Sequence, residues 1–363
     1  MKKQRILYFI ILIILLLYLI LNTKNAVNAI KDGAILFFNG VLPSLFPFLV
    51  ISNMFFKLDY AKYMAKIFSP FMTKFFRTSG IGAYPLITSI ICGYPIGSKS
   101  VCDMYLNNKL TKQQASKLIS ICSTPGPIFV IGTVCSIFLN LPVSAIIMLI
   151  SIYSALFIYA KIFFKYDKET KINISHSNYK KHYNIGKIFS DSITNSLNTL
   201  LSVMGYIMFF SLVINLIDNT IFFSEHLPFK LHIFLSAFIK GLIEMTNGIK
   251  ELSTINIIPL PLIISSITFL LSFGGFCANM QCISFIVNTD LNVLKYIISK
   301  IILGSISAII SYILSFIFLR GEITTFAVSN FLPFPYSITS VFFFCIVYTF
   351  IITVSAVILK KEI

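Results

Sequence analysis

Charged residues are scarce in this sequence. Of its 363 residues, 12% are charged and 57% are hydrophobic, whereas soluble proteins carry about 25% charged residues. No single soluble core can bury so much apolar surface. The composition therefore excludes a soluble enzyme, a disulfide-stapled secreted domain and a disordered regulator. It indicates an all-α polytopic membrane protein, which needs long apolar helices to cross the bilayer.

Motifs for catalysis and metal binding are also missing. The sequence contains no HExxH zinc motif, no GxSxG nucleophile elbow and no P-loop. Its seven cysteines are scattered, and none belongs to a CxxC pair. Ser98 and Lys99 are adjacent, so they diverge on a helix and make a poor nucleophile–base pair. We therefore expect no enzymatic activity, no metal, no cofactor and free thiols.

Acidic residues number only 13, against 29 lysines and arginines, which leaves a net charge of +16. Most of the basic residues lie in short stretches between apolar runs. This distribution is typical of the positive-inside rule and not of a nucleic-acid-binding face. The expected partner is a lipid bilayer, with no nucleic acid.

Eight apolar stretches are predicted to cross the membrane, because a bilayer core about 30 Å thick needs roughly 20 apolar residues per helix. They are 6–21, 33–56, 123–139, 143–164, 192–217, 259–286, 293–318 and 338–359. The stretch 123–139 is short and is interrupted near its start. No small-residue cleavage site follows the first stretch, so we predict that it is a retained anchor with a cytoplasmic N-terminus.

Two more apolar stretches, 80–106 and 231–255, are each interrupted by turn residues. The interruptions are Cys92–Ser98 in the first stretch and Glu244–Gly248 in the second. Glycine and proline free backbone groups there, and such groups are tolerated at membrane depth only where protein or a polar cavity satisfies them. We predict two re-entrant hairpins, each entering and leaving on one side of the membrane.

This threading fixes a predicted orientation. Both termini and the 165–190 loop face the cytoplasm, whereas 218–230 and 319–337 face outward. Loop lysines and arginines then divide 21 to 5 in favour of the cytoplasmic side, with Lys300 counted among the inside charges. The basic stretch 57–77 is predicted to be an amphipathic helix on the inner surface.

The two halves of the chain carry a weak repeat in which span, hairpin and broken helix follow in the same order. The matched residues are Asp32, Asn39, Leu42 and Ser52 with Asp191, Asn198, Leu201 and Ser211; Gly97 and Lys99 with Gly248 and Lys250; and Ser123 and Gly126 with Ser272 and Gly275. The threading gives the halves opposite orientations. Inverted repeats with interrupted helices are typical of transporters, whose substrates bind near the midplane at half-helix ends.

Several motifs also resemble those of the YlbJ/SpoVV-type sporulation integral membrane proteins. They are Gly40-Val-Leu-Pro-Ser-Leu-Phe-Pro-Phe48, Gly93-Tyr-Pro-Ile-Gly-Ser-Lys99, Ser123-Thr-Pro-Gly-Pro127, Gly241-Leu-Ile-Glu-Met-Thr-Asn-Gly248 and Ser272-Phe-Gly-Gly-Phe276. The resemblance covers residues 30–318. It implies nucleoside-recognition (Gate) domains similar to the concentrative nucleoside transporters. It also implies a multi-pass protein of the bacterial cell membrane that moves dipicolinic acid through the mother-cell-derived outer forespore membrane.

With this resemblance, the predicted division of the chain has five parts. They are an N-terminal membrane anchor at 1–28, a first Gate-type repeat at 29–164, a basic cytoplasmic linker at 165–190, a second Gate-type repeat at 191–318 and a C-terminal transmembrane helix at 319–363.

The predicted substrate-binding residues surround the interruptions. They are Tyr94, Gly97, Ser98, Lys99, Ser123, Thr124, Gly126, Glu244, Thr246, Asn247, Ser272, Gly274, Gly275, Asn279 and Gln281. An acidic residue inside a hairpin is functional by default, and Glu244 is a candidate carrier of a coupling proton. The alternative is a surface pair with Lys240, four residues earlier. Lys99 is either the counter-charge of an anionic substrate or a lysine that snorkels to the interface.

Three functions follow. The first is transport of a small organic anion such as dipicolinate. The second is transport of a neutral nucleoside or another small solute, with Asn247, Asn279 and Gln281 as hydrogen-bond partners. The third is a non-transporting assembly role in spore formation. The coupling ion, proton or sodium, and the existence of a homo-oligomer stay open at this point.

Overall fold

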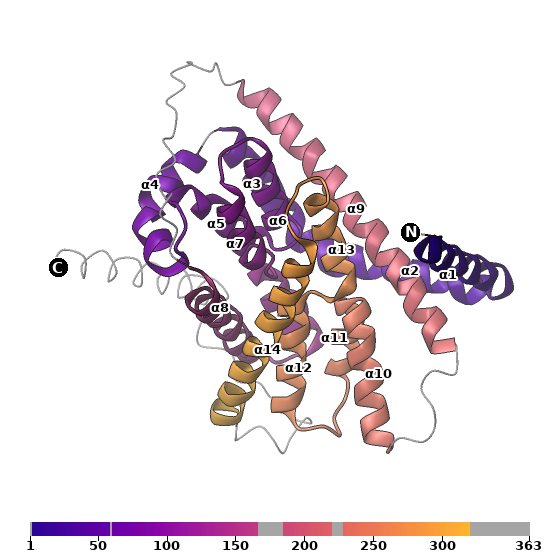
Figure 1. Cartoon of the computed structure of the whole chain (residues 1–363). Coiled ribbons are helices and arrows are strands. Elements are labelled where there is room, and N and C mark those ends of the chain that lie inside the picture. The colour runs from indigo at the N-terminus through magenta and orange to yellow at the C-terminus, as the bar shows by residue number, and fades with distance from the viewer. Residues whose placement is uncertain (1, 59, 166–183, 220–227, 320–363) are drawn as a thin grey trace.

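The computed structural model describes residues 2–58, 60–165, 184–219 and 228–319, and all regular structure in these ranges is helical (Figure 1). Five helical stretches among these residues are long and apolar enough to cross a membrane: Thr23–Phe55, Val143–Phe163, Ile185–Asp218, Leu260–Ile286 and Val293–Phe318. The predicted all-α polytopic class is confirmed. The predicted span 338–359 lies outside the described residues.

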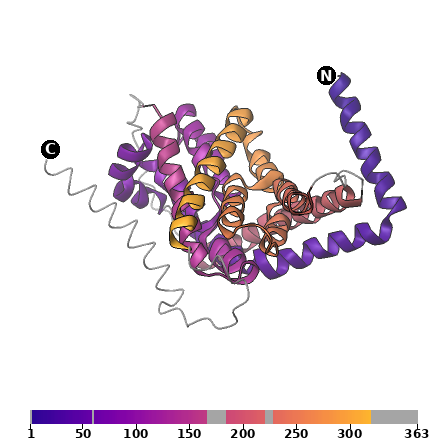
Figure 2. The same cartoon turned by 90° about the horizontal axis from the view of Figure 1, so that it is seen from below.

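The N-terminal part of the chain forms two consecutive helical segments. Helix α1 (Lys2–Leu21) ends at Asn22, and α2 (Thr23–Leu36), the π-helical turn η1 (Phe37–Val41) and α3 (Leu42–Lys57) then follow without a break. The predicted span 33–56 therefore starts ten residues too late. Polar residues lower the hydropathy of 23–32, but none of them ends a helix. Figure 2 shows α1 projecting away from the helix bundle.

The long helix 23–57 packs along α9 (Ile185–Asn219) in an antiparallel arrangement. At one end, Lys57 forms a 3.0 Å ion pair with Asp191, and the Asn53 amide donates to Ser196 Oγ at 3.0 Å. Farther along, a Cβ on Gly33 would lie 2.8 Å from the Oγ of Ser211. The first helices of the two predicted repeats therefore run in opposite directions, as the threading requires.

Both predicted hairpins are present. The first consists of α5 (Ala83–Cys92) and α6 (Ile96–Leu106), and the second of α10 (Phe229–Ile243) and α11 (Met245–Ser253). A Cβ on Gly248 would lie 2.1 Å from the Cα of Gly241, so the arms of the second hairpin touch at glycine. Gly248 therefore serves close packing inside α11 and does not form the tip.

Each repeat also contains a helix broken in the middle. The first is α7 (Lys112–Ile121) followed by the π-helix η4 (Phe129–Phe138), and the second is α12 (Leu260–Phe273) followed by α13 (Gly275–Ile286). The predicted break at Ser123–Pro127 is present, but the stretch 123–139 is not a span of its own, because it holds this break and the second half of a helix that begins at Lys112. Consecutive Pro-Gly-Pro residues at 125–127 interrupt that helix.

Helices α8 (Val143–Phe163) and α14 (Val293–Phe318) close the two repeats and pack against each other. The element order is therefore the same in both halves: long helix, hairpin, broken helix and closing helix. Between the first long helix and the first hairpin lie α4 (Ala61–Phe71), η2 (Met72–Phe76) and the short turn η3 (Gly80–Gly82), so the helix predicted within 57–77 is present. Its location on the inner membrane surface stays a prediction. The boundaries of the five predicted parts stay predictions, and most of the linker falls outside the described residues.

Candidate functional site

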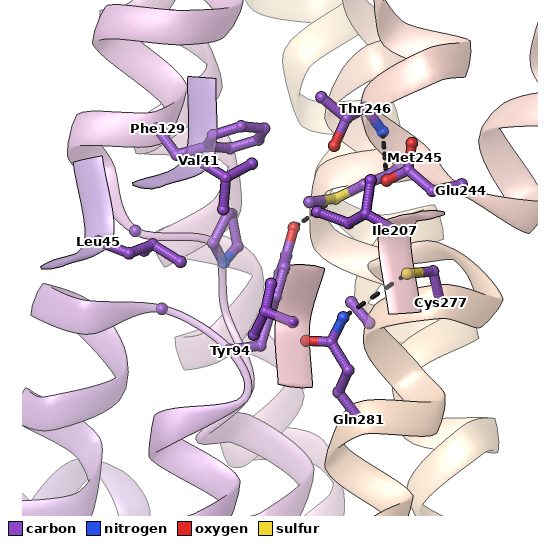
Figure 3. Close-up of a pocket in the computed structure, with 15 residues that line it drawn as sticks. Val41, Leu45, Tyr94, Phe129, Ile207, Glu244, Met245, Thr246, Cys277 and Gln281 are labelled. Carbon is purple, nitrogen blue, oxygen red and sulfur yellow. Dashed lines mark hydrogen bonds between the residues drawn. The ribbon is translucent and has the colours of Figure 1, made fainter. Parts of the chain in front are cut away.

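The breaks of both hairpins and both broken helices meet around one central cavity (Figure 3). The cavity encloses about 40 Å³, which is room for a few water molecules and far less than the roughly 300 Å³ of a small-ligand pocket. Its lining comprises Val41, Leu45, Gly93, Tyr94, Pro125, Gly126, Phe129, Val203, Ile207, Glu244, Met245, Thr246, Cys277, Ala278 and Gln281. Of the predicted site residues, five line this cavity: Tyr94, Gly126, Glu244, Thr246 and Gln281.

Glu244 is 1% exposed and stands at the break between α10 and α11. Its carboxylate accepts hydrogen bonds from the backbone N–H groups of Thr246 and Asn247, at 3.0 and 2.8 Å. These bonds cap the N-terminus of α11, where the helix dipole favours negative charge. A buried carboxylate is tolerated only with such compensation.

The alternative pairing of Glu244 with Lys240 is wrong. Lys240 instead forms ion pairs with Asp218 and Glu251, at 3.0 and 2.9 Å. The reason is the break itself: Glu244 has an extended backbone with φ −134° and ψ 110°, so it does not share the face of α10 with Lys240 as an uninterrupted helix would require.

Two of the three predicted amide partners are bound within the protein. Asn247 donates to Ser211 Oγ at 3.0 Å. Asn279 donates to the carbonyls of Phe273 and Gly275, at 2.9 and 2.7 Å, and its oxygen accepts from the Tyr296 hydroxyl at 2.9 Å. Both amides hold a break in place and lie outside the lining. Gln281 lines the cavity, and its Nε2 is 3.6 Å from the sulfur of Cys277.

Tyr94 joins the two hairpin tips across the cavity. Its hydroxyl donates to the sulfur of Met245, the residue after Glu244 (Figure 3). Gly93 precedes it with φ +78°, and a Cβ there would lie 2.7 Å from the backbone N of Gly126. Only glycine meets both the left-handed conformation and the close approach of the two chain breaks.

Other predicted site residues lie outside the cavity lining and contact the segments that form the breaks. Ser98 Oγ donates to the Cys122 carbonyl at 3.4 Å, and a Cβ on Gly97 would lie 2.3 Å from the same oxygen. These two residues lie in the first turn of α6, because the hairpin breaks at Gly93–Pro95 and not at Gly97.

The break of the first broken helix is held by Thr124, which shares a hydrogen bond with Ser89 at 3.1 Å. At the break of the second, Gly274 and Gly275 adopt φ +89° and +62° and allow the turn between α12 and α13. The hydroxyls of Ser123 and Ser272 are buried without a hydrogen-bond partner.

A second, larger cavity of about 420 Å³ adjoins the first. The two linings share Val203 and Gln281, and we call the larger cavity the vestibule. It is lined by Pro95, Lys99, Asn195, Asn198, Thr199, Ser202, Val203, Tyr206, Gln281, Ser284 and Phe285. Lys99 supplies the cation of this lining, and its Nζ lies 5.9 Å from the ring centroid of Phe285.

The polar wall of the vestibule was missed from the sequence. Asn195, Asn198, Thr199 and Ser202 all come from the N-terminal half of α9. Their spacing of i, i+3, i+4 and i+7 is that of one helix face. A polar stripe at this spacing within an otherwise apolar span was the signal that would have found the vestibule.

Lys300 corrects the sequence-based count of cytoplasmic charges. It was counted among the inside charges, but it lies in α14 with 1% of its surface exposed, and its ammonium donates to the backbone carbonyl of Ser123. Hydropathy cannot distinguish a lysine that flanks a span from one buried two turns inside it. The cytoplasmic excess falls by one residue and keeps its sign.

An exposed ion pair lies at the vestibule side of the molecule. Lys112, at the start of α7, contacts Asp290 at 2.7 Å, and the Tyr105 hydroxyl donates to the same carboxylate at 2.7 Å. These two contacts hold the pKa of Asp290 below its ordinary value, and Lys112 has the larger effect of the two. They tie the loop after α13 to the turn between α6 and α7.

Metal-ligating side chains do not cluster anywhere in the described residues. Six of the seven cysteines fall in these residues, and all six are buried free thiols, which agrees with the prediction. Cys345 lies outside them. The absence of enzymatic activity stays a prediction.

Comparison with known proteins supports part of the resemblance. No family model and no solved structure matches the chain. The sporulation integral membrane protein YlbJ of Bacillus subtilis (strain 168) is 24% identical over 312 residues, which cover 78% of this chain and 76% of that protein. The likeness to Gate domains and to nucleoside transporters stays a prediction. The chain is thus a multi-pass membrane protein that is similar to a YlbJ-type sporulation integral membrane protein.

Proposed function

We propose that this protein is a sporulation-associated transporter that moves a small organic anion, dipicolinate, across the outer forespore membrane. The observation that carries the proposal is the meeting of four interrupted helical elements around one central cavity. Irregular backbone at membrane depth is tolerated where it lines such a site. A purely structural helix bundle has no need of four matched breaks.

The vestibule offers the route to that cavity. It adjoins the central cavity at Val203 and Gln281, and its 420 Å³ falls in the usual size range for a small-ligand site. The central cavity is closed to such a molecule. A transport cycle therefore requires the tips of the hairpins to separate, which breaks the contact between Tyr94 and Met245.

The charges favour an anion on the vestibule side. Lys99 is the cation of the vestibule lining, and Phe285 beside it offers an apolar face for a flat aromatic ring. Glu244 already occupies the N-terminus of α11. We therefore place the carboxylates of the substrate near Lys99 and not at that helix end.

The nucleoside alternative loses part of its basis. It relied on Asn247, Asn279 and Gln281, and the first two amides are engaged in hydrogen bonds that hold the breaks. Gln281 and the polar stripe of α9 remain as partners for a neutral solute.

The test is flux into liposomes that contain the purified protein. Labelled dipicolinate and labelled uridine are compared at equal concentration, with protein-free liposomes as the control. Saturable dipicolinate flux that exceeds uridine flux supports the proposal. Preferential uridine flux favours the nucleoside alternative, and flux of neither solute favours an assembly role.

A further inference from the structure

Lys300 and Glu244 are the two buried charged side chains of the described residues, each 1% exposed. Glu244 belongs to the central cavity. Lys300 lines neither the central cavity nor the vestibule, and no carboxylate of the described residues pairs with it. A lysine that snorkels keeps its ammonium in water, which the burial of Lys300 excludes. An ionisable group at such a position is expensive and calls for a functional reason.

Segments of both repeats meet at this lysine. The ammonium binds the Ser123 carbonyl in the break after α7, from the first repeat. The thiol of Cys282, on α13 of the second repeat, is buried and lies near Lys300. Any change in the charge of Lys300 therefore acts on the contact between the two repeats.

The Ser123 carbonyl is the type of group that binds a coupling cation. In broken-helix transporters, carbonyls of unwound backbone at the half-helix ends coordinate Na⁺ or accept the proton-linked group. In this protein, the ammonium of its own Lys300 occupies that position at the Ser123 carbonyl. It has three N–H donors, and the structure gives it one acceptor, the Ser123 carbonyl.

We infer that Lys300 is the tethered coupling cation of the transporter: it carries a proton through the cycle, and no sodium ion is needed. The inference rests on the transport function proposed above. With the ammonium on Ser123, the repeats are joined as in this structure. When an N–H bond of the ammonium breaks, its proton passes to a water molecule and the nitrogen keeps the electron pair. The neutral amine then releases the repeats, and the reverse step reloads the proton from water.

Few other groups near Lys300 are able to exchange a proton. Among the elements packed against α14, the buried titratable side chains are Cys277 and Cys282 on α13, Cys122 at the end of α7 and Tyr159 on α8; the lysines of α7 and α8 are not buried, and α12 has no titratable side chain. On α14 itself, Tyr296 lies one turn before Lys300. Thiols and phenols are neutral at pH 7, so Lys300 is the group in this cluster that carries charge.

The experiment separates net proton coupling from transport itself. The purified full-length protein is placed in liposomes, and tracer exchange of dipicolinate at equal internal and external concentration is measured first. Accumulation is then driven by a gradient of one pH unit, or by a sodium gradient at constant pH. One proton per substrate gives about tenfold accumulation from one pH unit.

Three variants are compared with the natural protein. Lys300→Met removes the charge, and Lys300→Arg keeps a cation that does not release its proton. Lys295→Met changes an exposed lysine of the same helix and serves as the control. We expect Lys300→Met to retain exchange but lose the tenfold accumulation. Lys300→Arg should lose both, because its fixed cation keeps the repeats joined, and Lys295→Met should retain both. If Lys300→Met fails to insert as a single species in size-exclusion chromatography, Lys300→Arg carries the test.

The outcomes are distinct. Accumulation in Lys300→Arg equal to that of the natural protein makes Lys300 a fixed structural cation and overturns the inference. Accumulation driven by sodium, or exchange in the natural protein without any pH-driven accumulation, also overturns it. Absence of dipicolinate exchange in the natural protein instead rejects the transport function itself.

Discussion

The two buried charges found among the described residues, Glu244 and Lys300, are compensated in different ways. Glu244 caps the N-terminus of α11 with two backbone N–H bonds, so helix dipole and hydrogen bonds both favour its anion. Lys300 has a single backbone acceptor, in a break where the chain is not helical. Burial of a charge costs several kcal/mol unless its partners offset it. The anion of Glu244 is therefore better compensated than the cation of Lys300, which is the group that we propose to change its charge.

We expect the largest effect on transport from removal of the Glu244 charge. Glu244→Gln keeps one side-chain oxygen to accept from Thr246 or Asn247, but it removes the negative charge at the tip of the hairpin. We expect insertion and folding to persist and dipicolinate flux in liposomes to be abolished. Glu251→Gln is the control, since this carboxylate pairs with Lys240 away from the cavity lining. Natural-level flux in Glu244→Gln rejects the role of the charge.

The next effect concerns the hairpin that positions Glu244. The Cβ of Gly248→Ala would lie 2.1 Å from the backbone of Gly241, so the arms must move apart. Overpacking of this kind costs about 1–3 kcal/mol or more, and we expect a lower melting temperature together with lost flux. Gly132→Ala is the matched control, because a Cβ there meets nothing within 4 Å. Equal melting temperatures for the two variants contradict the close packing.

A third charge, that of Lys99 in the vestibule, should have a smaller effect. Lys99 is a half-buried cation of the vestibule lining next to Phe285. Without it, the substrate carboxylate can bind water instead. We expect Lys99→Met to weaken dipicolinate binding about tenfold, equivalent to roughly 1.4 kcal/mol, and to leave uridine binding unchanged. Lys250→Met changes the repeat counterpart of Lys99, which lies outside both cavities. Calorimetric titration measures both solutes, and equal dipicolinate affinity in the two variants makes Lys99 an interfacial anchor only.

The sequence predicted the order of the elements better than the positions of their ends. Apolar runs and the Gly and Pro residues that interrupt them were sufficient for the two hairpins and for the breaks at Ser123–Pro127 and Ser272–Gly275. They were insufficient for the start of the first long helix at Thr23, because hydropathy falls at polar residues that a helix tolerates. They also did not identify Lys112–Ile121 as the first half of the broken helix that continues at Phe129–Phe138.

In the candidate site, too, the sequence identified residues that stand out locally but not those whose role depends on distant contacts. Glu244 stood out because a carboxylate inside an apolar hairpin is rare. Lys300 did not, because a lysine near the start of a span is ordinary under the positive-inside rule. Its burial depends on Ser123, which is 177 residues away in the chain. The engagement of Asn247 and Asn279 likewise depends on partners that no local pattern identifies.

We expect the smallest effect from the exposed ion pair of Lys112 and Asp290, whose mutual attraction is weakened by solvent. Asp290 is held by Lys112 and Tyr105 at the protein surface, and its pKa is lowered. A lowered folded-state pKa gives stability that is present above the unfolded pKa, about 3.9 for Asp, and is lost as the pH falls through the folded value. Because exposed pairs contribute little, we expect Asp290→Asn to leave the melting temperature nearly unchanged at pH 7. The loss of stability of the natural protein below about pH 4 should become slightly shallower in this variant. Melting temperatures of both proteins in detergent from pH 7 to pH 3 provide the measurement. A large drop at pH 7 shows instead that this surface contact holds the loop after α13, and with it the vestibule, in place.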